Sequence, residues 1–92
     1  MKTILNKATD IEYGSSKVSY FDLCKMSLDI QPEGGFDVTT MRQRIRVADK
    51  LVSDEAELED SEYETLKSCI ENMKWTMAHK DIVGFVDYVL SL

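Results

Sequence analysis

The 92-residue sequence contains few of the residues that cross-link small folds or hold metals: it has two cysteines and one histidine. Cys24 and Cys69 lie far apart and within apolar patterns, whereas small secreted scaffolds carry several closely spaced cysteines. We therefore expect both thiols to be free and buried. Cys24, Cys69 and His79 also lack the paired spacing of zinc ligands, so we expect no metal and no cofactor.

The sequence also lacks long apolar runs. No segment approaches the roughly 18 apolar residues that can span a bilayer. Near the N-terminus, Asn6, Lys7 and Asp10 interrupt any signal-peptide core. We therefore expect a cytoplasmic protein that does not enter a membrane. A chain of this length is expected to form one domain, because two smaller cores would not offset the loss of chain entropy.

Residues suited to catalysis are equally scarce. A catalytic nucleophile needs a base and an orienting group, and His79 is the only histidine. Its position beside Lys80 and Asp81, at an expected helix start, favours a capping or solvent-facing role. The acids of 54–64 lack the glycine pattern of a calcium loop, and "PEGGF" lacks the spacing and the lysine of a phosphate-binding loop. We expect no enzymatic activity.

Charge is abundant but unevenly placed in a chain with a formal net charge of −6. Segment 41–50, "MRQRIRVADK", is rich in basic residues, whereas 54–64, "DEAELEDSEYE", contains none. Dedicated nucleic-acid-binding domains normally present a net basic face. We therefore expect the basic charge to be paired with these acids inside the molecule or between copies. The basic residues are Arg42, Arg44, Arg46 and Lys50, and the candidate partners include Glu57, Glu59, Glu62 and Glu64.

Helical periodicity predicts four helices, over about 20–29, 39–53, 61–75 and 79–91. In the first segment the alternation of Cys24, Met26 and Leu28 also fits a strand, and its Leu, Met, Lys and Cys content favours the helix. "QPEGG" at 31–35 predicts a loop. Ser61 and Glu64 have the spacing of a capping box.

Each predicted helix has an apolar stripe that we expect to face the core. In the last helix Gly84 suggests a close helix crossing, since glycine otherwise weakens a helix by about 1 kcal/mol. The stripes comprise Tyr20, Leu23, Cys24 and Ser27; Met41, Ile45, Ala48 and Val52, widened by Leu51; Tyr63, Leu66, Cys69 or Ile70, Met73 and Met77; and Ile82, Phe85, Val86, Val89 and Leu90.

The N-terminal segment 1–18 is expected to form an arm, either irregular or folded as a short β-hairpin around "YGSSK". Ala56 and Leu58, between alternating acids, allow one very short extended segment. The predicted fold is therefore mainly α, a compact helical domain at 19–92 preceded by the arm 1–18. An α+β fold is the alternative.

Protein–protein interaction, including self-association, is the function that this pattern favours. Trp75 is expected either as a core residue or as a recognition anchor, because aromatic and Met side chains are enriched at interfaces. The alternative is a nucleic-acid-binding regulator that uses the basic segment 41–50. Arg44 lies apart from the Arg42–Arg46 face and is the first residue to test for an outside partner. The candidate contact residues are Arg42, Arg44, Arg46, Lys50, Glu57, Glu59, Trp75 and Tyr88.

The order of three segments, "FDVTTMRQRIRVADKLV", "LEDSEYETLKSCIENMKW" and "DIVGFVDYVLSL", resembles that of small accessory proteins encoded by tailed phages and prophages. The similarity covers about the last 60 residues and contains no catalytic motif, so it assigns no functional residue. It implies a small non-enzymatic protein of the bacterial host cytoplasm, which acts by contact with itself or other proteins in particle assembly or host control.

Overall fold

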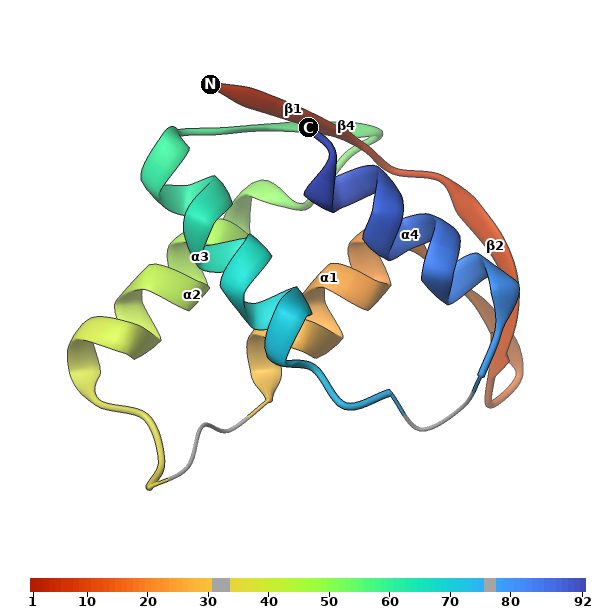
Figure 1. Ribbon diagram of the computed structural model, residues 1–92, viewed down its shortest axis with the longest axis horizontal. Helices are drawn as coiled ribbons and strands as arrows, with labels where there is room; N and C mark the ends of the chain where they lie inside the picture. Colours follow the sequence, from red (N-terminus) through yellow and green to blue (C-terminus); the bar gives the residue numbers. More distant parts are fainter. Residues whose placement is uncertain (31–33, 76–77) are drawn as a thin grey trace.

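The computed structural model describes residues 1–30, 34–75 and 78–92, and within these ranges the chain has an α+β fold (Figure 1). The prediction of a mainly α fold is therefore wrong. The strands were expected only as options beside the helices, because three of them have only four residues, too few to show a clear period. The elements in chain order are β1 (Lys2–Leu5), β2 (Ala8–Tyr13), β3 (Ser16–Ser19), α1 (Tyr20–Asp29), α2 (Val38–Lys50), β4 (Glu55–Leu58), α3 (Asp60–Asn72) and α4 (Lys80–Leu90).

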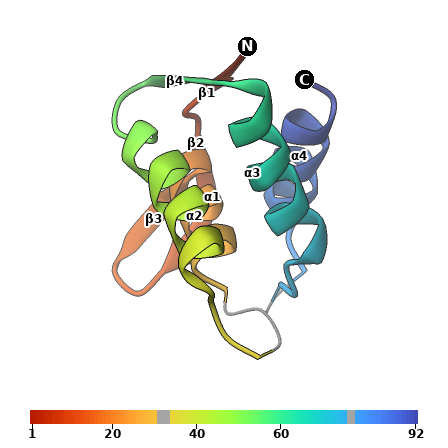
Figure 2. The ribbon, with the colours of Figure 1, turned by 90° about the vertical axis from the view of Figure 1, so that its left-hand side faces the viewer.

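The helices form two layers (Figure 2). One layer contains α1 and α2 with the β2–β3 hairpin beside them, and the other contains α3 and α4. Contacts of α3 with both α1 and α2 join the two layers. The pair β1–β4 lies across one end of the molecule, near both termini (Figure 1). All four predicted helices are present, with ends within three residues of those expected.

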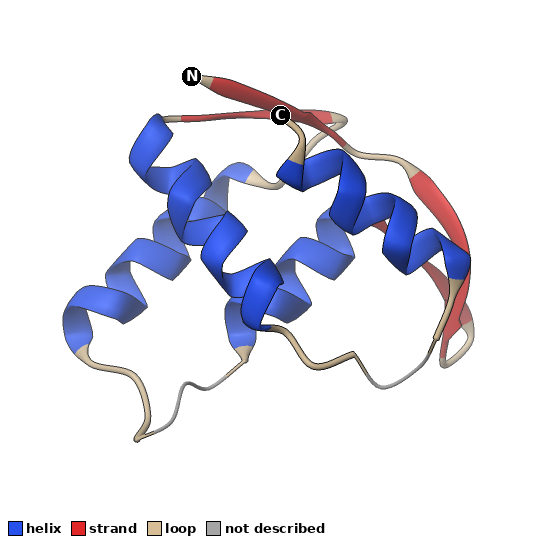
Figure 3. Cartoon of the chain, viewed as in Figure 1, coloured by secondary structure: helices blue, strands red, loops and turns tan. Residues whose placement is uncertain are grey.

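Two antiparallel strand pairs complete the fold (Figure 3). β2 and β3 form the hairpin that "YGSSK" suggested, and Gly14 takes the left-handed backbone conformation in its turn, with φ of +69°. β1 pairs with the distant β4, with Ile4 opposite Ala56. The very short extended segment around Ala56 and Leu58 is thus a strand, and it closes the contact between the chain's N-terminus and its middle.

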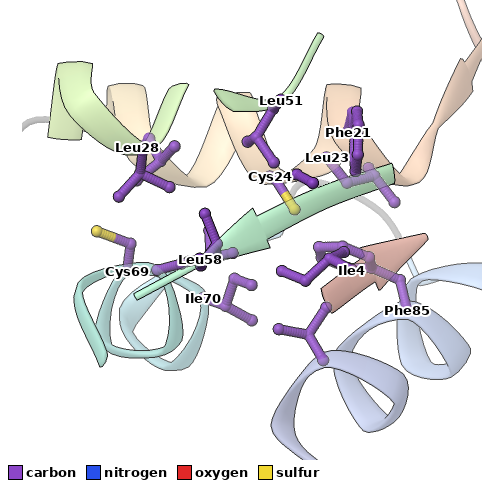
Figure 4. Packing of buried hydrophobic residues seen from close by; sticks show 14 of the residues in the cluster. Ile4, Phe21, Leu23, Cys24, Leu28, Leu51, Leu58, Cys69, Ile70 and Phe85 are labelled. Atoms are coloured by element: carbon purple, nitrogen blue, oxygen red, sulfur yellow. The ribbon is translucent and has the colours of Figure 1, made fainter. Parts of the chain in front are cut away.

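The core lies between the helical layers and the β1–β4 pair (Figure 4). Ile4 of β1 and Leu58 of β4 are fully buried there, together with Cys24 of α1 and Phe85 of α4. Ile11 of β2 is also part of this core. Segment 1–18 therefore contributes buried side chains to the common core through β1 and β2.

Local hydrogen bonds explain where the helices begin. Ser19 caps α1: its N–H donates to the Asp22 carboxylate at 2.9 Å, and its hydroxyl oxygen accepts from the Asp22 N–H at 3.4 Å. This reciprocal pair favours the helix over the alternative strand. At the start of α4, Nδ1 of His79 accepts from the Asp81 N–H at 3.0 Å, which confirms the expected capping role.

The core stripes of α3 and α4 are confirmed, whereas the predicted capping box Ser61–Glu64 is wrong. Because α3 begins one residue earlier than expected, Glu62 occupies the reciprocal position and accepts from the Glu59 N–H at 2.8 Å. The stripe member Met77 lies outside the described residues. The buried stripe residues are Tyr63, Leu66, Cys69 and Ile70 on α3 and Ile82, Phe85 and Val89 on α4.

Replacing Gly84 with Ala is expected to raise the free energy of unfolding by about 0.5–1 kcal/mol. The predicted close helix crossing is not present at Gly84, since a Cβ there would meet only the Tyr20 hydroxyl, at 3.9 Å. Urea unfolding measures the change. Gly14→Ala is the matched control, because its positive φ makes that substitution destabilising. A less stable Gly84→Ala protein would contradict the prediction.

Candidate functional site

α2 turns most of its apolar side chains to solvent. Within the helix only Val47 is buried, whereas Val38, Met41 and Ile45 are 61%, 43% and 52% exposed. Of the predicted core stripe, Met41, Ile45 and Val52 are exposed, Val52 by 71%. Ala48 is half-buried against the core, and Leu51, which widened the stripe, is buried. We call Val38, Met41 and Ile45 the α2 stripe.

The reason is that α2 carries two apolar rows. Val47 and Leu51, four residues apart, lie on one side of the helix and are buried. Val38, Met41 and Ile45 follow the spacing i, i+3, i+7 on a neighbouring side. Val47 and Leu51 lie in the core cluster with residues of α1, α3 and β4. Val38, Met41 and Ile45 are left exposed by the described residues.

A groove adjoins the α2 stripe. It has a volume of about 260 Å³ and lies between the end of α1, Phe36 and α2. Leu28, Phe36, Met41, Ile45 and Ala48 supply its apolar lining. The stripe and the groove together form one continuous apolar surface on this part of the molecule.

Arg44 holds the end of α1 against α2. Its guanidinium donates to the carbonyl oxygens of Leu28, at 3.0 Å, and Ile30, at 2.5 Å, and lies 5.0 Å from the ring centre of Phe36. The last turn of α1 contains no basic residue, so Arg44 supplies the positive charge that the helix C-terminus favours. Arg44, the first residue to test for an outside partner, is therefore engaged in hydrogen bonds inside the molecule.

Lys50 and Glu62 form an ion pair between α2 and α3. Nζ of Lys50 lies 2.6 Å from Oε1 of Glu62, whose side chain is 6% exposed. Burial acts to raise the pKa of Glu62. The hydrogen bonds from Lys50 and the Glu59 amide, with the charges of Lys50 and Arg46, outweigh it and hold the pKa below its ordinary value. The expected pairing of the basic segment with the acidic one is present here.

The remaining basic residues, Arg42 and Arg46, are exposed. Arg42 and Asp49 lie beside the α2 stripe on the helix surface. Arg46 lies on the side of α2 that faces α3, where it lines a small hollow with Ser61, Glu62 and Thr65. Of the four basic residues, two are thus engaged within the molecule and two face solvent. The four residues do not act as one basic patch, because Arg44 is bound to the carbonyl end of α1 and Lys50 is paired with Glu62.

The other expected contact residues have different roles. Tyr88 is half-buried, and its hydroxyl accepts from the Leu5 N–H at 3.0 Å, which ties α4 to β1. Lys7 lies over the Tyr88 ring, 4.8 Å from its centre. Trp75 is half-buried and packs edge-to-face on Phe85 at 6.2 Å. Glu57 and Glu59 are exposed at β4 and at the start of α3.

Trp75 also lines a second groove, between α3 and α4. This groove has a volume of about 540 Å³, and its lining is mainly apolar. Among the residues that the structure describes, the charged ones in its lining are Glu71 and Asp87. Trp75 was expected either in the core or at an interface, and it is half-buried against the core.

Burial disfavours the thiolate form of both cysteines. Burial raises the pKa of Cys24 to about 12, and burial also raises the pKa of Cys69 despite the opposing charge of Arg44. Both thiols are free and buried, as predicted. Within residues 1–30, 34–75 and 78–92, no three His, Cys, Asp or Glu side chains gather to hold a metal ion. In the same ranges no helix has the length and apolar character to cross a bilayer.

Comparison with family models, with curated proteins and with solved structures finds no significant match to this chain.

Proposed function

We propose that this chain is a non-enzymatic protein-interaction module that contacts its partner through the α2 stripe. One observation carries the proposal: a 13-residue helix buries one of its own side chains while Val38, Met41 and Ile45 remain exposed beside an apolar groove. Scattered apolar residues on a surface need no explanation, but a continuous apolar row on one helix is typical of an interaction site.

The spacing of the α2 stripe supports a helical or extended partner segment. Residues at i, i+3 and i+7 are the anchors by which one amphipathic helix packs against another surface. Exposed Arg42 and Asp49 border the stripe with charges of opposite sign, so the partner meets it mainly through an apolar surface. Arg44 and Lys50 support the site indirectly, because they fix α2 against α1 and α3.

No observation favours the nucleic-acid alternative, since two of its four basic residues are engaged inside the molecule. The phage-accessory role suggested by the sequence remains a hypothesis. It agrees with a protein that acts by contact, and it adds no residue to the proposed site.

Site-specific photo-crosslinking tests the proposed contact. A photoreactive phenylalanine analogue in place of Met41 is expected to give discrete protein adducts in an extract of the source cells. The same analogue in place of Glu57, exposed on β4, is the control and should give none. Adding Ile45→Glu should remove the Met41 adducts, because it introduces a charge into the α2 stripe. Equal labelling from both positions, or no adduct at Met41, would refute the proposal.

A further inference from the structure

The α2 stripe and the half-buried Ala48 after it have the repeat by which two helices pack along a seam. Val38, Met41, Ile45 and Ala48 are spaced by three, four and three residues, which is the spacing of such a seam. The first turns of α2 lie at the outer edge of the molecule (Figure 1), and the described residues leave the stripe exposed. α2 therefore offers its seam to a second helix.

One flank of this seam carries two opposite charges. Arg42 follows Met41 and Asp49 follows Ala48, so both charges lie on the same side of the seam, seven residues apart. Both side chains are exposed, and neither forms an ion pair among the residues that the structure describes. Arg46 lies off this flank, on the side that faces α3. The flank thus has a basic end and an acidic end.

A second α2 that runs antiparallel to the first matches these charges. A two-fold axis close to Ile45, midway between Arg42 and Asp49, exchanges the two ends of the seam. Arg42 of each copy then faces Asp49 of the other, so one patch used twice gives two pairs of opposite charge. In a parallel pair Asp49 would instead meet Arg44 of the other copy, whose guanidinium is already held by the end of α1. The antiparallel pair also sets the two helix dipoles head to tail.

The charges around the seam favour a second copy as its partner. On the other flank, beside the groove at the end of α1, Arg44 and Asp29 contribute one base and one acid. Together with Arg42 and Asp49 they make a neutral surface, on a chain whose net charge of −6 otherwise repels a second copy. Docking into the groove between α3 and α4 would offer Asp49 no partner, because the described charged residues of that lining are both acids.

We propose that two copies of this chain pair through an antiparallel contact of their α2 helices. The inference rests on the proposed function and names the partner of that site. The contact uses one surface twice, so assembly stops at a dimer. Two short helices bury less area than a typical stable interface, so the dimer is reversible and its population depends on concentration.

A charge introduced into the seam tests the apolar contact. By sedimentation velocity, the wild-type mass is expected to rise with concentration from the 10.5 kDa of one chain towards twice that value and no further. Ile45→Glu should weaken the dimer by roughly tenfold or more, because the new carboxylate is buried in the seam without a partner. Val83→Glu on α4 is the matched control and should dimerise like the wild type, since Val83 and Ile45 are similarly exposed, at 60% and 52%. Circular dichroism confirms that each variant is folded.

Exchanged charges test the antiparallel arrangement separately. Arg42→Asp and Asp49→Arg should each weaken the dimer by roughly fivefold or more, because like charges then face each other in both pairs. An equimolar mixture of the two variants should regain the dimer, since each substituted flank meets one of opposite charge. Lys74→Asp is the control: Lys74 is exposed after α3, and the substitution makes the same charge change as Arg42→Asp without an effect on the dimer.

Each contrary result overturns the inference in a recognisable way. A wild-type protein that stays monomeric up to about 1 mM would exclude the dimer. A loss of association in Val83→Glu would place the contact on the groove between α3 and α4, and a mixture of charge variants that stays monomeric would exclude the antiparallel pairing. If the dimer is excluded, adducts from Met41 to a different protein still support the proposed function, so the two failures are distinguishable.

Discussion

Phe85→Ala is expected to lower the free energy of unfolding by about 3–5 kcal/mol, the usual cost of removing a large aromatic side chain from a core. Phe85 is completely buried. Its ring packs edge-to-face on Tyr20 at 5.2 Å and on Trp75 at 6.2 Å, so it joins α1, α4 and the segment that follows α3. The cavity left by Ala would separate these three elements, and little nearby could move in to fill it.

Urea unfolding followed by circular dichroism and by Trp75 fluorescence measures this loss. In a domain of this size, each kcal/mol corresponds to roughly 4–8 °C in Tm. Val83→Ala is the control, because Val83 lies on the same helix and is exposed; its cost should stay within about 0.5 kcal/mol. A Phe85→Ala protein that lost less than about 1 kcal/mol would show that the two layers do not depend on this ring.

The helices were predictable because each has at least ten residues and a local start signal. Ser19 with Asp22, and His79 before Asp81, place these signals in the sequence itself. The pair β1–β4 had no equivalent signal. Lys2 pairs with Leu58 across more than half of the chain, and such pairing depends on the assembled core rather than on local residue preference.

The orientation of α2 shows why periodicity alone does not identify a buried face. Its sequence contains two apolar rows, one through Met41 and Ile45 and one through Val47 and Leu51. The longer row was expected in the core, with Leu51 beside it. The shorter row is buried, because it lies in the core cluster to which α1, α3 and β4 also contribute. Tertiary contacts decide which of the two rows is buried. The row that stays exposed is the candidate site.

The sequence pattern likewise predicted only part of the contacts that the charged residues make. The sequence indicated that 41–50 and 54–64 would neutralise one another, and Lys50–Glu62 is such a pair. It did not indicate that Arg44 would bind the carbonyl end of α1, because that contact depends on where α1 ends relative to α2. Tyr88 is a parallel case, since its partner, the Leu5 N–H, is brought near by the β1–β4 pairing.

Lys50→Met is expected to lower the free energy of unfolding by about 1–2 kcal/mol at neutral pH. Charge-assisted hydrogen bonds contribute somewhat more when fully buried, but Lys50 is 38% exposed and solvent screens the pair. The methionine keeps the apolar part of the side chain and leaves the buried Glu62 carboxylate with fewer partners. Glu62→Gln completes a double-mutant cycle, in which Lys50→Met should cost little once the carboxylate is gone.

The pH dependence of the loss of unfolding free energy in Lys50→Met tests whether the ion pair is its source. The lowered pKa of Glu62 means that its contribution to stability is present above the ordinary carboxyl pKa and is lost as the pH falls through the folded-state value. In Lys50→Met the burial of Glu62 is less opposed, so its pKa rises and acidification protonates it readily. The difference in unfolding free energy between wild type and Lys50→Met should therefore shrink from pH 7 to about pH 3. A difference that stays constant over this range would mean that Lys50 stabilises the fold by packing alone.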